Sequence, residues 1–96
     1  MATVTITFFK PAMYEGFGVI GDVVSTEAIT SSGTSQQSSV SSDGYDICRV
    51  SVSGGDVHIL NGANPTADTD DMLLPAGSTE YFKLSDGDVV AIINAG

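Results

Sequence analysis

Positive charge is scarce in this chain. Its 96 residues include three lysines or arginines against twelve aspartates or glutamates, which gives a formal net charge of -9. Proteins hold nucleic-acid phosphates and anionic membrane surfaces through clustered cations, and Lys10, Arg49 and Lys83 are too few and too scattered in the sequence for that. We therefore expect neither a nucleic-acid partner nor a membrane partner.

Segments that would direct the chain into a membrane or out of the cell are missing as well. No apolar run approaches the roughly 20 residues of a transmembrane helix. The first residues do not join a basic stretch to an apolar one, as a secretory leader does. We expect a protein that is made in a cytoplasm.

The chain contains one cysteine and one histidine. A single cysteine cannot form an intramolecular disulfide, and Cys48 alternates with Val50 and Val52 on an apolar face, where we expect it to be buried. His58 has no second histidine and no paired cysteine to complete a metal site, so we expect it at the surface or in an interface. It could reach Cys48 across a hairpin, but nothing in the pattern requires a nucleophile. We expect no enzyme, no catalytic residue and no cofactor.

The densest acidic cluster is formed by Asp68, Asp70 and Asp71. Alternate aspartates are typical of calcium loops, but such a loop counted from Asp68 needs glycine at its sixth position, where Leu73 stands. We expect a solvated loop here and no bound metal.

Most of the chain alternates between apolar and polar residues, with the two-residue period of strands that bury one face. Residues 34–40 form a weaker, serine-rich candidate for an edge strand, and residues 22–30 a short strand. Glycine-containing turns at residues 53–56 and 85–88 predict a hairpin between the strands on either side of each turn. The remaining predicted strands are residues 2–9, 46–52, 56–60, 80–84 and 88–93.

The predicted elements indicate a single all-β domain over residues 1–96. A chain of this size buries roughly 60–65% of its unfolded surface, so its core is thin and a partner subunit adds useful stability. We expect about six to eight strands in a small antiparallel β-barrel or a jelly-roll-like sandwich.

Residues 12–21 interrupt this pattern, because bulky apolar residues alternate there with three glycines. Pro11 is expected to end the preceding strand. One interpretation is a loop that folds back to plug one end of the barrel. The other is an exposed apolar arm that docks on another subunit, in a dimer or trimer of this chain or on a different protein. The candidate interface residues are Pro11, Met13, Tyr14 and Phe17.

The second half of the chain resembles a family of small virion proteins of tailed phages. The residues that carry the resemblance are 48–52, 56–67, 72–82 and 87–93. It implies a structural protein that is made in the host cytoplasm and decorates and stabilises a capsid by binding the major capsid protein. A neck, tail or fibre component of a virion is an alternative.

Residues 80–93 also resemble the closing strands of jelly-roll and cupin-like domains, although one histidine cannot supply the cupin metal ligands. A small ligand-binding module of the carbohydrate type is a further alternative. It lacks tryptophan, and Tyr14, Tyr45 and Tyr81 are the tyrosines that could form an aromatic platform.

Overall fold

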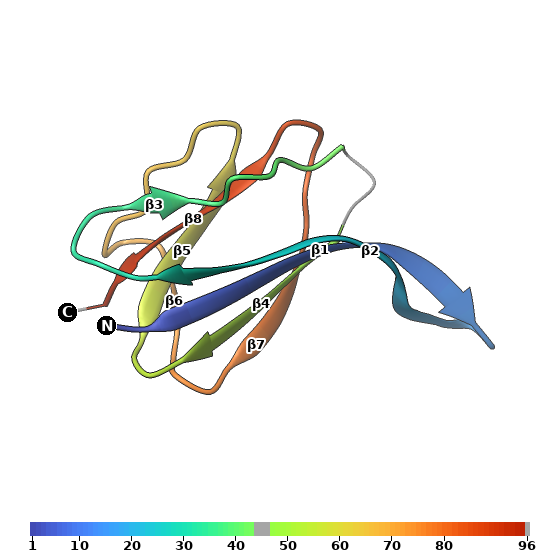
Figure 1. The fold of residues 1–96 in the computed structure, drawn as a ribbon, viewed down its shortest axis with the longest axis horizontal. Coiled ribbons are helices and arrows are strands. Elements are labelled where there is room, and N and C mark those ends of the chain that lie inside the picture. The colour runs from blue at the N-terminus through green and yellow to red at the C-terminus, as the bar shows by residue number, and fades with distance from the viewer. Residues whose placement is uncertain (44–46, 96) are drawn as a thin grey trace.

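The computed structural model describes residues 1–43 and 47–95, except for the side chains of Met13, Tyr14 and Phe17. Within these residues the chain forms two antiparallel four-stranded sheets that pack as a sandwich (Figure 1). The strands are β1 (Thr3–Tyr14), β2 (Phe17–Thr30), β3 (Gln36–Gln37), β4 (Ile47–Ser53), β5 (Val57–Gly62), β6 (Met72–Leu74), β7 (Thr79–Lys83) and β8 (Val89–Asn94). The expectation of an all-β fold is confirmed.

One sheet, which we call sheet A, has the order β2-β1-β4-β7, and the other, sheet B, has the order β3-β8-β5-β6. The two sheets do not close into a barrel, so the barrel alternative is wrong and the sandwich alternative is right. If strands are counted from β2 and β1 is counted last, the orders become 1-8-3-6 and 2-7-4-5. This is the strand order of a jelly roll whose last strand has moved to the front.

The core lies between the inner faces of the sheets. Alternation places Val4, Ile6 and Phe8 of β1 on the inner face, at 1% exposure or less, and their outward neighbours are threonines. Strand β4 contributes Cys48, Val50 and Val52, paired with those three residues in reverse order. Sheet B supplies Val57, Ile59, Leu74, Val90 and Ile92. Burial of these aliphatic and aromatic side chains is the main favourable term that holds the two layers together.

Both predicted hairpins are wrong, although the strands around them are present. Gly54 and Gly87 do turn the chain, with φ angles of +82° and +85° that favour glycine. However, β4 and β5 lie in different sheets, and so do β7 and β8. Each turn therefore carries the chain across the core. The physical reason is that two successive strands with apolar faces bury them equally well side by side or face to face.

Two side-chain hydroxyls hold the ends of the sandwich. The buried Ser31 Oγ accepts a hydrogen bond from the Ala2 amide at 2.8 Å and donates one to Asn94 Oδ1. The buried Ser38 Oγ accepts from the Val90 amide at 3.1 Å. These bonds satisfy backbone groups that would otherwise be buried without partners.

The segment expected to be irregular forms a regular hairpin. Strand β1 continues through Pro11 to Tyr14, and β2 returns from Phe17 through all of residues 22–30. The pairing slips between Phe8 and Phe9 and again between Phe9 and Pro11. Such bulges tolerate proline and increase the local twist, which explains why Pro11 does not end the strand.

Candidate docking site

A two-stranded arm projects from one end of the sandwich (Figure 1). We define the arm as residues 10–22. Within the described residues β4 pairs with β1 as far as Phe9, where β4 begins at Ile47, whereas β1 and β2 remain paired out to Tyr14 and Phe17. A two-stranded hairpin is marginally stable by itself in water. Among the arm side chains that the structure describes, none belongs to the hydrophobic core cluster.

The tip of the arm is a tight turn through Glu15 and Gly16, whose φ angles are +47° and +90°. Two successive residues at positive φ are typical of a two-residue hairpin loop, which favours asparagine, aspartate or glycine at the first position. Glutamate at that position is unfavourable, because its Cβ crowds the backbone in the left-handed region.

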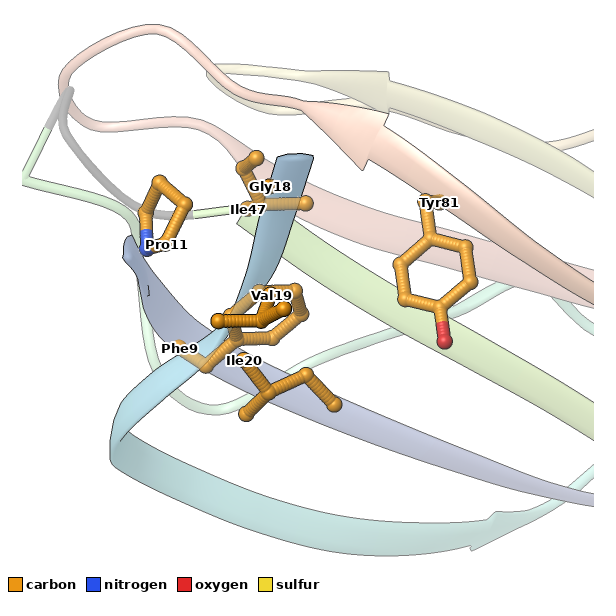
Figure 2. Close-up of a pocket in the computed structure, with 7 residues that line it drawn as sticks. All are labelled: Phe9, Pro11, Gly18, Val19, Ile20, Ile47 and Tyr81. Atoms are coloured by element: carbon orange, nitrogen blue, oxygen red, sulfur yellow. The ribbon is translucent and has the colours of Figure 1, made fainter. Parts of the chain in front are cut away.

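An apolar hollow of about 620 Å³ lies between the arm and the neighbouring strands of sheet A. Its lining combines arm residues with residues of sheet A, namely Phe9, Pro11, Gly18, Val19, Ile20, Ile47 and Tyr81. Figure 2 shows Val19 and Ile20 beside the Phe9 ring on one side of the hollow and Tyr81 on the other. The rings of Phe9 and Tyr81 lie 6.1 Å apart, edge to face, which is a favourable geometry for aromatic pairs.

The walls of the hollow are open to solvent although they are apolar. Val19, Ile20 and Tyr81 are 42%, 47% and 55% exposed, while Phe9 beneath them is buried. A contiguous apolar recess on a small, strongly charged protein is typical of a surface that binds another molecule.

The hollow opens onto the outer face of sheet A, which sheet B does not cover. Register places hydroxyl, apolar and basic side chains on this face, namely Thr3, Thr5, Thr7, Phe9, Thr26, Ala28, Thr30, Ile47, Arg49, Ser51, Ser53, Thr79, Tyr81 and Lys83. These positions of the described strands include no aspartate or glutamate, although the chain has twelve acidic residues. They include two of its three cations, Arg49 and Lys83. The face is therefore the basic side of an acidic protein.

The residues predicted to form an interface fall within the arm. Pro11 lines the hollow. The side chains of Met13, Tyr14 and Phe17 lie outside the described residues, although their backbone forms the outer part of the hairpin. Docking through this arm remains a prediction.

Sequence reasoning missed Phe9 and Ile47, and it named Tyr81 as one of three tyrosines that could form an aromatic platform but not as part of this hollow. These residues meet through the pairing of Phe9 with Ile47 and of Arg49 with Tyr81. One signal could have indicated them: Phe9 is an aromatic residue at a position where Thr3, Thr5 and Thr7 predict a polar outward face.

Cys48 and His58 are not brought together. Cys48 faces the core from β4, and burial raises the pKa of its thiol to about 12, so the reactive thiolate is disfavoured. His58 is half-buried on the outer side of β5, where its Nδ1 lies 2.9 Å from the carbonyl oxygen of Asp71. Because a carbonyl oxygen only accepts, this contact requires a proton on Nδ1. The predicted burial of Cys48 is confirmed.

The acidic loop satisfies its own backbone. Asp71 Oδ2 accepts from the Asp68 amide, and Asp68 Oδ1 accepts from the Asp70 amide, each at 2.8 Å. In residues 1–43 and 47–95 no group of three or more histidine, cysteine or acidic side chains is placed to hold a metal ion. The same part of the chain has no helix long and apolar enough to cross a membrane.

No protein-family model matches this chain, and neither a curated protein nor a solved structure does. The function is therefore inferred from the geometry of the arm, the hollow and the outer face of sheet A.

Proposed function

We propose that this protein is a structural subunit that joins a larger assembly by docking its arm on another subunit. The observation that carries the proposal is the arm itself, a hairpin whose described side chains lie outside the core cluster and include exposed apolar ones beside an apolar hollow. Water-exposed apolar surface of this kind is stabilised when a partner covers it.

The setting that we propose is a tailed-phage virion, with the protein decorating the capsid and contacting the major capsid protein. The resemblance of residues 48–52, 56–67, 72–82 and 87–93 to small virion proteins supports this setting. The acidic surface also fits a protein that must stay soluble at high concentration before it assembles.

The experiment begins with the genes that flank the coding sequence. If a capsid gene is adjacent, the two proteins are produced together and the occupancy of this protein on purified capsids is measured. Tyr14→Ala and Phe17→Ala should each lower the affinity at least about thirtyfold, because truncating an interface anchor typically costs about 2 kcal/mol or more of binding energy. Their melting temperatures should stay near that of the unaltered protein.

Met72→Ala and Leu73→Ala are the matched controls. Both residues are exposed apolar side chains, at 55% and 50%, but they lie on β6 in sheet B, away from the arm. Full occupancy of the arm variants, or an equal loss in the β6 variants, contradicts docking through the arm. If a tail gene is adjacent instead of a capsid gene, capsid decoration is contradicted, and the same occupancy measurement is made on purified tails.

A further inference from the structure

The chemistry of the hollow restricts what can fill it. Its lining is apolar, and Arg49 and Lys83 lie on the same face of sheet A, next to Tyr81 and Ile47 in the strand register. A partner that fits must present bulky apolar side chains next to a negative charge, because opposite charges at the rim of an apolar contact fix its orientation.

The arm tip of this chain has that composition. Residues 13–17 are Met, Tyr, Glu, Gly and Phe, and Glu15 is the one charged residue among them. Methionine and aromatic side chains are enriched at the centres of interfaces. At roughly 3.3 Å per residue, the extended strand from Phe9 to Tyr14 carries the tip about 17 Å beyond Phe9, although Gly18, beside the tip, also lines the hollow.

The backbone of Glu15 gives an independent reason to look for a partner. Its φ angle of +47° is one that asparagine or glycine adopts more easily. A residue held in an unfavourable backbone conformation at an exposed tip is typical of a functional contact. The turn geometry alone does not favour glutamate at position 15, whereas a contact between its carboxylate and cations of a partner does.

We propose that the hollow receives the arm tip of a second copy of this chain, with Glu15 of that copy facing Arg49 and Lys83. The inference rests on the proposed docking role of the arm and names the subunit that receives it. The hollow runs along the arm from Gly18 to Ile47 and Tyr81 at the base, and Glu15 lies at the end of the arm. Two arms lying side by side in opposite directions therefore place each tip at the base of the other, and a two-fold dimer satisfies both contacts at once.

The test uses the purified chain alone, because no other component is needed. Sedimentation velocity is measured at protein concentrations from about 0.1 to about 100 μM, a range that covers dissociation constants common for protein dimers. It should show a dimer at the highest concentrations. Glu15→Lys and Arg49→Glu should each weaken the dimer at least about tenfold, since each places like charges in both contacts of the dimer. The double variant should recover most of the affinity, because it restores opposite charges.

Asp70→Lys is the matched control for net charge, since it changes the charge of the chain by the same amount as Glu15→Lys. It lies in the exposed loop between β5 and β6 and should leave the dimer unchanged. Glu15→Asn should improve the turn and slow amide hydrogen exchange in residues 10–22 of the monomer while it weakens the dimer. A purely structural role for Glu15 would not separate these two measurements.

The outcomes separate this inference from the proposed function. A monomer at every concentration, or a double variant that stays as weak as the single variants, overturns the exchange of arm tips. If that monomer still occupies capsids in an arm-dependent way, the arm docks on a different protein and the proposed function stands. If the monomer does not occupy capsids either, both proposals fail.

Discussion

The arm and the sandwich should respond separately to a substitution at Gly21. A Cβ atom at this position would lie 2.5 Å from the backbone carbonyl oxygen of Lys10 and 3.3 Å from the Ala12 side chain. Neither the carbonyl nor the strand that carries it can move without opening the pairing of β1 with β2. Gly21→Ala therefore introduces an overpacking penalty of about 1–3 kcal/mol.

This penalty should fall on the arm alone, because the core cluster contains none of the arm side chains that the structure describes. The free energy of global unfolding in urea should change by less than about 0.5 kcal/mol, as for surface substitutions. Amide hydrogen exchange in residues 10–22 should accelerate by about 5- to 150-fold, which corresponds to about 1–3 kcal/mol of easier local opening. Protection in β4 and β8 should stay the same.

Two variants serve as references. Gly18→Ala makes the same chemical change three residues away, where a Cβ atom meets nothing within 4 Å, so it should leave exchange and unfolding unchanged. Ile6→Ala, in the core at 1% exposure, should lower the free energy of global unfolding by about 2–5 kcal/mol. If Gly21→Ala destabilises the whole protein as Ile6→Ala does, the arm unfolds together with the sandwich and the reasoning is refuted.

Two more predictions concern the sandwich. Ser31→Ala should lower the free energy of unfolding by about 1–3 kcal/mol, because the buried Ala2 amide loses its acceptor; an unchanged urea midpoint contradicts this. The Cys48 thiol should resist alkylation until the protein unfolds. Burial raises the pKa of this thiol from 9.0 to about 12, so the thiol of the unfolded chain ionises at a lower pH than that of the folded chain. The contribution of the buried thiol to the free energy of unfolding should therefore be fully present below pH 9 and be lost between pH 9 and 12. Cys48→Val should reduce that decline, and an identical pH profile for the variant contradicts the assignment.

Strand positions could be predicted from this sequence because burial of one face imposes a two-residue period on the residues. The strands near residues 46–52, 56–60, 80–84 and 88–93 were predicted to within about two residues of their observed ends. The short pairing of Gln36 and Gln37 with β8 fits the weak edge strand expected there. Strand β6 was missed, because three residues beside a proline carry too little periodicity to be recognised.

The pairing partner of each strand could not be predicted. Alternation shows which face of a strand is buried, but it does not show which strand lies beside it or which sheet covers it. Glycine at Gly54 and Gly87 indicates a turn but does not distinguish a hairpin from a crossing between sheets. In the arm, a segment that was predicted to be irregular is in fact a pair of strands. Pro11 and the glycines argue against a strand, yet the bulges accommodate Pro11. The hollow depends on contacts between Phe9, Ile47 and Tyr81, each of which lies more than thirty residues from the next in the sequence.

The described side chains of the arm lie outside the folding core, and this separation has an evolutionary consequence. In most small domains a new binding specificity must be found among substitutions that the core tolerates. Here residues 10–22 can exchange one apolar or charged side chain for another while the sheets retain their stability. Lineages of this scaffold could therefore acquire new attachment partners by a few changes in one short stretch of the gene, and a protein engineer could redirect it in the same way.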